Sequence, residues 1–329
     1  MGASAPIYNM LKIFDCSNST CRPLHRGFGG PIENTIVRDL KKYASDYGCE
    51  FVLSLRDADV AFTNDVFTDS VVASNIPKIK RMDGVFFQDD LKNRNVSLNL
   101  AATQADMVIF ISEFSRHAFN ALYGIKLHAS TVVLNWVDQD IFDFRHRTAV
   151  VPNKFVAVAT SWDRPEKRYN DIIKLANRFP NKQFFTVGHV NDTTQYPNVK
   201  HYGYIEDEHT LASILHEMDA MICLAYRDAA PKTVAQGIST GLPCFGVRCG
   251  GVPELIGDTG LLFGEYTHYD FMKTIPPVSD HMCPMFEIFC RRYGDYARTL
   301  RVDPHRYQKV LASYFNIFKL VDQAAHTQQ

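Results

Sequence analysis

Short apolar runs alternate with longer segments of helical periodicity in the N-terminal part of the chain. The short runs have the length of strands, and the longer segments carry apolar residues three or four positions apart. This alternation is typical of a parallel sheet with helices on both faces. The predicted strands are residues 7–14, 49–55, 60–63, 77–82, 107–111 and 131–134, and the predicted helices are residues 32–47, 91–103 and 115–123.

A second alternation of the same kind begins at residue 154. After Tyr269 the pattern changes to two helical stretches, at about residues 285–300 and 305–321. The charged stretch 138–153 lacks periodicity and contains Pro152, so it is interpreted as a linker. The predicted strands of this second part are residues 154–160, 183–188, 220–224 and 243–246, and its helices are residues 170–179, 210–218 and 233–240.

These patterns predict an α/β chain with two doubly wound, Rossmann-like domains. We expect the first domain in residues 1–149, the second in residues 150–304, and a C-terminal helix with a polar tail in residues 305–329. Ligands of doubly wound sheets bind at the carboxyl ends of the strands. The predicted binding site is therefore a cleft in which the two sheets face each other.

Composition and charge narrow the classes of function. The 329 residues are 46% hydrophobic and 22% charged, which is ordinary for a soluble globular protein of two domains. Lys and Arg number 35 and Asp and Glu 36, so the net charge of −1 gives no overall attraction to nucleic acid or membranes. Peripheral membrane contact through a local patch stays open. No apolar run has the length of a membrane span, and the N-terminus lacks a secretion signal, so we predict a cytoplasmic protein.

Cysteine and histidine give no sign of a metal site. The eight cysteines form no Cys-x-x-Cys pair, and several lie inside apolar runs, so we interpret them as buried structural thiols. The 12 histidines show no spacing typical of metal ligands. Aromatic residues are not interleaved with basic ones, as they would be in many nucleic-acid-binding domains. We therefore expect neither a bound metal nor a nucleic-acid partner.

A glycine-rich turn, RGFGGP at residues 26–31, separates the first predicted strand from the first predicted helix. Gly29 and Gly30 let the backbone approach a ligand closely, and the start of the helix offers N–H groups to an anion. The turn does not match Gly-x-Gly-x-x-Gly. Contact with a phosphate or a sugar and a plain turn are both consistent with it.

The segment from residue 224 to 254, LAYRDAAPKTVAQGISTGLPCFGVRCGGVPE, carries the most specific chemistry. Pro231 stands where helix starts favour proline, so the backbone N–H groups of Lys232 and Thr233 point out of a helix N-terminus. Such an end, with the Lys232 side chain beside it, suits a diphosphate. Gln236 lies one turn further along the same side, where its amide can hydrogen-bond ribose hydroxyls.

This segment resembles the donor-binding signature of the retaining GT-B glycosyltransferases of the family-4 type (glycosyl transferases group 1). That signature has two acidic residues separated by seven others, then Gly-x-Pro-Val and Gly-Gly-x-Pro-Glu. Asp228 stands at the first acidic position and Gln236 at the second, where the family usually has Glu at both. Asp keeps the charge on a shorter side chain, whereas Gln keeps hydrogen bonding without the charge. By this resemblance Asp228 would hold hydroxyls of the transferred sugar.

Other segments extend the resemblance along most of the chain. Gly29 and Gly30 correspond to the family's opening Gly-Gly loop, and Lys167 to the lysine that neutralises the donor diphosphate. The family's partner arginine is missing upstream of that lysine, and Arg164 is the candidate substitute. The backbone at Ile205 corresponds to the stretch that meets the nucleobase. Asp83, before Gly84, replaces the histidine that lies against the sugar, and there it would accept hydroxyls or stabilise positive charge at the anomeric carbon.

The resemblance implies a glycosyltransferase that uses a nucleoside diphosphate sugar, such as a UDP- or GDP-sugar, with retention of anomeric configuration. It implies no divalent metal and no further cofactor. The acceptor would be a hydroxyl of a glycan, a lipid-linked molecule or a small molecule, and the last helix would cross back to the first domain. The departures at Asp228 and Gln236 and the missing upstream arginine motivate an alternative, a weak or inactive GT-B module that binds sugar or nucleotide as a regulatory subunit. A nicotinamide-dependent dehydrogenase shares the fold class, but the chain lacks the Gly-x-Gly-x-x-Gly fingerprint.

Overall fold

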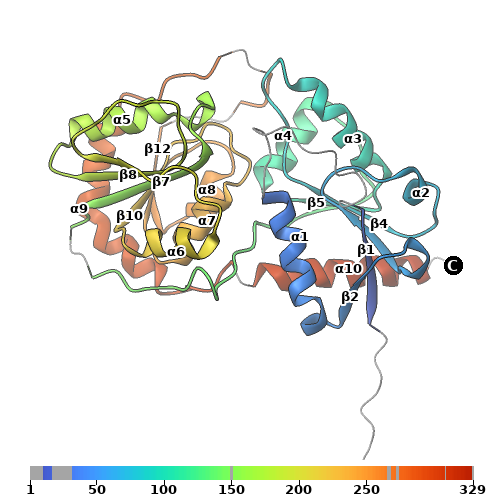
Figure 1. The fold of residues 1–329 in the computed structure, drawn as a ribbon. Helices are drawn as coiled ribbons and strands as arrows, with labels where there is room; N and C mark the ends of the chain where they lie inside the picture. The colour runs from blue at the N-terminus through green and yellow to red at the C-terminus, as the bar shows by residue number, and fades with distance from the viewer. Residues whose placement is uncertain are drawn as a thin grey trace, which may run out of the picture.

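The computed structural model describes residues 10–16, 32–148, 151–264, 268–271, 274–307 and 309–327. Within these residues the chain forms two parallel six-stranded sheets that carry helices and lie side by side (Figure 1). The predicted α/β class, with two doubly wound units, is confirmed.

The first sheet lies in the N-terminal part of the chain. It contains β1 (Leu11–Asp15), β2 (Cys49–Val52), β3 (Val60–Thr63), β4 (Lys78–Met82), β5 (Met107–Phe110) and β6 (Ser130–Val132). These strands pair in the order β2-β1-β3-β4-β5-β6, with Ile13 opposite Val60. The central strands β3 and β4 are buried almost throughout, as expected where helices cover both faces of a parallel sheet.

Local signals explain where two helices of this domain begin or end. They are α1 (Ile32–Tyr43), α2 (Asp69–Val72), α3 (Asn95–Gln104) and α4 (Glu113–Tyr123). Helix α4 starts two residues earlier than predicted, because the Ser112 hydroxyl accepts a hydrogen bond from the Ser115 N–H at 3.0 Å and caps the first turn. The predicted helix 32–47 ends as an α-helix at Tyr43 and continues as a 3-10 turn to Tyr47. Gly48, in the left-handed region at φ 67°, then ends it.

The second sheet contains β7 (Lys154–Ser161), β8 (Gln183–His189), β9 (Val199–His201), β10 (Ala220–Cys223), β11 (Cys244–Val247) and β12 (Gly260–Phe263). Its strand order is β12-β11-β10-β7-β8-β9. The accompanying helices are α5 (Tyr169–Arg178), α6 (Glu208–His216), α7 (Lys232–Ser239), α8 (Val252–Ile256) and α9 (Met282–Leu300). The sequence patterns did not predict α2, β9, α8 and β12, which have only three to five residues each.

The last helix, α10 (Val310–Thr327), packs on the first sheet although it follows the second in sequence (Figure 1). Its buried residues Phe315 and Phe318 share a core with Phe62 of β3, and the Phe62 and Phe318 rings meet edge to face at 5.3 Å. The side chain of Arg81 donates from Nε to the Tyr314 hydroxyl at 3.0 Å. The chain therefore crosses between the two domains twice.

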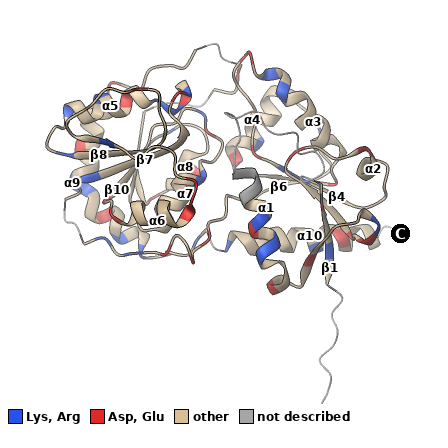
Figure 2. Cartoon of the chain, in the orientation of Figure 1, with Lys and Arg blue, Asp and Glu red and all other residues tan. Residues whose placement is uncertain are grey.

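Charged side chains are spread over both domains and do not gather on one of them (Figure 2). This distribution agrees with the net charge of −1. Among the helices in the described part of the chain, none is both long and apolar enough to cross a membrane.

Candidate functional site

The loop between β10 and α7 forms the centre of the candidate site. Strand β10 ends at Cys223, and most of the following loop is buried, with Asp228 and Ala229 partly exposed. Helix α7 begins at Lys232, and no described side chain caps its first turn. Pro231 immediately precedes the helix and has the extended backbone, with φ −63° and ψ 111°, that directs the chain into it.

Lys167 and Asp228 form a close ion pair in this site. The ammonium of Lys167 lies 2.5 Å from the Asp228 carboxylate, and both side chains are largely buried. Lys167 ends the short 3-10 turn that follows β7, so the pair joins the carboxyl ends of β7 and β10. The sequence predicted a phosphate contact for Lys167 and a sugar contact for Asp228, and the structure brings these two residues together.

Arg164, the predicted substitute for the family arginine, binds a neighbour in the sequence. Its guanidinium donates from Nε to the buried carboxylate of Glu166 at 2.7 Å, and its Nη2 lies 2.5 Å from the same oxygen. Arg164 thus precedes the turn that holds Lys167, and Glu166 orients it there.

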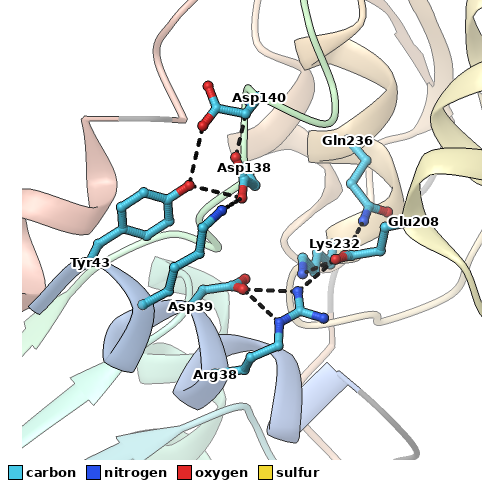
Figure 3. A network of polar contacts seen from close by, with 9 residues as sticks. Arg38, Asp39, Tyr43, Asp138, Asp140, Glu208, Lys232 and Gln236 are labelled. Carbon is cyan, nitrogen blue, oxygen red and sulfur yellow. Dashed lines mark hydrogen bonds and ion pairs between the residues drawn. The ribbon is translucent and has the colours of Figure 1, made fainter.

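Lys232 and Gln236 both turn toward one carboxylate that the sequence analysis did not single out (Figure 3). The Lys232 ammonium lies 3.3 Å from Glu208 Oε1, and the Gln236 amide donates to the same oxygen at 3.4 Å. Arg38, on helix α1 of the first domain, donates to Glu208 Oε2 at 2.7 Å. Glu208 in the first turn of α6 therefore joins α7 to α1.

The charges around Glu208 determine its ionisation. Burial acts to raise the pKa of Glu208, but Lys232 and Arg38 outweigh it and hold that pKa below its ordinary value. The neighbouring Asp39 is buried, and burial raises its pKa even though Lys232 and Arg38 act in the opposite direction. Glu208 is therefore ionised at neutral pH.

Asp83 is held at the carboxyl end of β4 by an arginine inside the first domain. The buried guanidinium of Arg81 contacts the Asp83 carboxylate and also donates to Asn135 Oδ1 at 2.7 Å. The Asn135 amide in turn donates to the carbonyl oxygen of Ala230 in the β10–α7 loop at 2.6 Å. A chain of three polar contacts thus links Asp83 to the loop that carries Asp228.

Two glycines allow close packing around Ala229, Gly84 from the first domain and Gly251 from within the second. A Cβ atom added at Gly84 would lie 2.9 Å from the Ala229 side chain, and Gly84 has φ 147°. A Cβ at Gly251 would lie 1.8 Å from the Ala229 carbonyl oxygen, closer than atoms can approach. Gly84 follows Asp83 and Ala229 follows Asp228, so this contact brings the two predicted acidic residues to one junction between the domains.

The glutamate of the Gly-Gly-x-Pro-Glu motif makes a second bridge between the domains. Glu254 accepts hydrogen bonds from the backbone N–H groups of Glu113 at 2.7 Å and Phe114 at 2.8 Å. These groups belong to the first turn of α4, where N–H groups lack partners within the helix and the helix dipole favours a carboxylate. Ser112 caps this turn from within the first domain, and Glu254 adds a cap from the other domain.

The remaining predicted residues have less defined roles. Thr233 donates from its hydroxyl to the Val158 carbonyl at 3.4 Å, which ties the start of α7 to β7. Ile205 is half-buried between β9 and α6 and packs against the core of the second domain. Gly29 and Gly30 lie outside the described residues.

No group of three or more His, Cys, Asp or Glu side chains in the described ranges is arranged to hold a metal ion. Positively charged side chains close to the site include Lys167, Lys232 and Arg38. Burial raises the pKa of the Cys223 thiol, at the end of β10, to about 11.

Comparison with known proteins yields glycosyltransferases. No family model matches the chain. The curated protein N-acetyl-alpha-D-glucosaminyl L-malate synthase from Bacillus anthracis is 22% identical over 246 residues, which cover 68% of this chain. The chain spans 62% of the length of that relative.

Solved structures resemble the chain over nearly its full length. A glycosyltransferase from Rickettsia africae has 14% identity and a TM-score of 0.64, and the match covers 95% of this chain and 99% of that one. Sucrose-phosphate synthase from Thermosynechococcus elongatus has 13% identity and a TM-score of 0.68, with 96% and 100% covered. WaaG, a glycosyltransferase involved in lipopolysaccharide biosynthesis, has 12% identity and a TM-score of 0.61, with 94% and 99% covered. The chain has the GT-B fold of these glycosyltransferases, as its sequence motifs predicted.

Proposed function

We propose that this protein is a metal-independent, retaining glycosyltransferase that moves a sugar from a nucleoside diphosphate sugar to a hydroxyl acceptor. The observation that carries the proposal is the close approach of Gly84 to Ala229, since these residues directly follow Asp83 and Asp228, and α7 begins shortly after Asp228. The Lys167 ammonium lies at the same place. Two carboxylates, a lysine and a helix N-terminus close to one junction between the domains would suit a sugar that is attached to a diphosphate.

Proteins of similar fold support the choice of donor class. One similar structure is a pneumococcal O-GlcNAc transferase in complex with UDP and GlcNAc, with a TM-score of 0.57. Another, with a TM-score of 0.56, holds UDP-2-fluoro glucose. We infer the same class of ligand for this chain, a nucleotide sugar.

The diphosphate is the part of the donor that most needs positive charge. During transfer the bond from the anomeric carbon to the diphosphate oxygen breaks, and the acceptor oxygen forms the new bond to that carbon. The diphosphate leaves with the electron pair of the broken bond and takes up the proton of the acceptor hydroxyl. Lys167, the N–H groups at Lys232 and Thr233, and the Lys232 ammonium would stabilise the developing negative charge.

The sugar and the ribose would lie to either side of the diphosphate. Asp228 would accept hydrogen bonds from sugar hydroxyls, and Asp83, approaching from the first domain, would stabilise positive charge at the anomeric carbon. Gln236 would contact the ribose, and the backbone near Ile205 the base. Domain closure over the donor would exclude water, which otherwise competes with the acceptor.

Release of nucleoside diphosphate from UDP-, GDP- and ADP-sugars, with and without EDTA, tests this proposal. The wild-type protein should consume one class of donor at the same rate in EDTA. Asp83→Asn should lower kcat at least tenfold and leave the dissociation constant of the nucleoside diphosphate within about twofold. Asp89→Asn, an exposed carboxylate that pairs with Lys92 in the same domain, is the matched control and should retain wild-type kcat.

Two results would contradict the proposal. Donor consumption that EDTA abolishes would show that a metal ion, and not the protein cations, stabilises the leaving diphosphate. An unchanged kcat in Asp83→Asn would show that Asp83 does not act at the anomeric carbon.

A further inference from the structure

Glu208 stands between the two parts of the candidate donor site that would bind the ends of a nucleotide. It opens helix α6, directly after the stretch around Ile205 that would meet the base. Its carboxylate contacts Lys232, the first residue of α7, where the diphosphate would bind (Figure 3). In a nucleoside diphosphate the ribose joins the base to the diphosphate. If the base and the diphosphate bind at these two places, the ribose between them lies close to the carboxylate of Glu208.

The partners of Glu208 form a hydrogen-bonding pattern that matches a vicinal diol. Each ribose hydroxyl donates one hydrogen bond and accepts others, so it needs an acceptor and a donor close together. Glu208 Oε1 supplies the acceptor, and the Gln236 amide and the Lys232 ammonium, both directed at that oxygen, supply donors. Asp207, the preceding residue, is engaged in capping α6 through the Thr210 N–H at 2.7 Å and does not compete for this role.

The two oxygens of Glu208 differ in how closely they hold their partners. The contacts of Oε1 with Lys232 and Gln236, 3.3 and 3.4 Å, are longer than ordinary N–H···O hydrogen bonds. The short contact of this carboxylate, 2.7 Å to Arg38, is made by the other oxygen, Oε2. Glu208 is partly exposed, whereas Gln236 is buried. Of these two residues, Glu208 is thus the more accessible to a ligand.

We propose that Glu208, and not the residue at position 236, supplies the carboxylate that recognises the ribose 2′,3′-diol of the donor. The proposal rests on the proposed function, because it assumes a nucleotide in this cleft. It names the substrate class more closely: a ribonucleoside diphosphate sugar, in preference to a 2′-deoxyribonucleoside diphosphate sugar such as a dTDP-sugar. It also explains how the chain carries Gln at position 236, since a second carboxylate there would lie against Glu208 and repel it.

The test compares ribose with 2′-deoxyribose in equilibrium binding. Dissociation constants are measured by calorimetry for UDP and dUDP, GDP and dGDP, and ADP and dADP. The wild-type protein should bind the ribonucleotide of the preferred base about tenfold to hundredfold more tightly, the effect of losing a hydrogen bond to a charged group. Glu208→Gln should bring this ratio close to one, because it weakens the ribonucleotide more than the deoxynucleotide, which has only the 3′-hydroxyl to lose.

Matched variants separate a specific role from a general loss of structure. Glu217→Gln, at the exposed end of the same helix, should keep the wild-type ratio. The double variant Glu208→Gln with Gln236→Glu transfers the carboxylate from position 208 to position 236, and it should restore the preference for ribose. Glu208→Asp keeps the charge on a shorter side chain and should reduce the preference for ribose less than Glu208→Gln does. Melting temperatures confirm that each variant is folded.

The outcomes distinguish the two proposals. If the wild-type protein binds neither ribonucleotides nor deoxyribonucleotides, the proposed function itself fails. If it binds nucleotides but Glu208→Gln keeps the full preference for ribose, the proposed function stands and the role of Glu208 is wrong. A wild-type protein that binds dUDP or dGDP as tightly as the ribonucleotide would also overturn the role of Glu208.

Discussion

Lys167 and Asp228 show how single residues of the site depend on each other. Each neutralises the other across 2.5 Å, so a diphosphate that reaches Lys167 must share it with Asp228. The sequence identifies both residues through motifs, but their contact joins positions 61 residues apart and has no local signal. Glu208 is the clearer case, because nothing in its surroundings along the chain distinguishes it from the exposed acidic residues beside it. Only the fold brings it to Lys232, Gln236 and Arg38.

At this scale we predict that Lys167 contributes specifically to phosphate binding. Lys167→Ala should raise the dissociation constant of the preferred nucleoside diphosphate about tenfold, since a charge-assisted hydrogen bond is lost. Affinity for the corresponding nucleoside, which has no phosphate, should change little. Lys174→Ala, which removes an exposed lysine paired with Asp171 on α5, is the control and should leave both affinities unchanged. Equal losses for nucleotide and nucleoside in Lys167→Ala would contradict a phosphate contact.

Gly251 gives a second prediction at the scale of the residue. Gly251→Ala places a Cβ 1.8 Å from the Ala229 carbonyl, so the loop that carries Asp228 must move, at a cost of about 1–3 kcal/mol. We expect a lower melting temperature and weaker nucleotide binding together. Gly294→Ala, on α9, meets only the end of Arg298 at 3.7 Å and should be neutral or stabilising. A Gly251→Ala protein with wild-type stability and affinity would show that the close approach is unimportant.

Among the elements, α4, α6 and α7 matter most because their ends lie at the junction of the domains. Glu254 caps α4 from the opposite domain, and Glu208 joins α6 to α7 and to α1. The longer helices were predictable because their hydrophobic period extends over several turns, and most strands were predictable as short apolar runs. Helices α2 and α8 were missed because four or five residues are too few to show a helical period, and the short strands β9 and β12 were missed as well.

At the end of α6, His216 contacts the linker, and its protonation makes the stability of the protein depend on pH. His216 lies against Asp143 of the linker, with its Nε2 2.9 Å from the Asp143 carbonyl oxygen. Burial lowers the pKa of His216 below 6.5, although Asp143 acts in the opposite direction. The unfolded chain therefore binds a proton here more readily than the folded one, and stability falls as the pH drops below 6.5.

His216→Gln should remove this part of the pH dependence. The free energy of unfolding in urea, measured at pH 7.5, 6.5 and 5.5, should fall less steeply toward acid in the variant than in the wild type. His326→Gln is a control in which the pH dependence should change in the opposite direction. Hydrogen bonding to the Asp322 carbonyl and the charge of Asp322 raise the pKa of His326. Identical pH profiles for His216→Gln and the wild type would contradict this account.

In the whole molecule, the C-terminal helix makes the first domain dependent on the last residues of the chain. Helix α10 contributes Tyr314, Phe315 and Phe318 to the core of the first sheet. Its Tyr314 also meets Arg81, which orients Asp83 and Asn135. The packing of the C-terminal helix therefore supports the half of the site that the first domain supplies. Amphipathic periodicity predicted the helix itself, but its position on the first domain was expected only from the family resemblance.

Phe318→Ala tests this dependence. Removing the buried ring should lower the free energy of unfolding by about 3–5 kcal/mol, through lost burial and the cavity left behind. Leu320→Ala on the same helix, where the side chain is 62% exposed, should cost less than about 0.5 kcal/mol. Comparable losses for the two variants in urea unfolding would show that α10 does not dock through this face.

The central claim is that the cleft between the domains binds a nucleoside diphosphate without a metal ion, and a thermal-shift measurement tests it most directly. Melting temperatures are recorded with UDP, GDP, ADP, dTDP and their common sugar conjugates, with and without EDTA. A ligand that binds only the folded protein raises the melting temperature. We predict an increase with one ribonucleotide class, unchanged by EDTA and smaller in Lys167→Ala. No increase with any nucleotide would contradict the donor site and would favour a GT-B module without transferase activity.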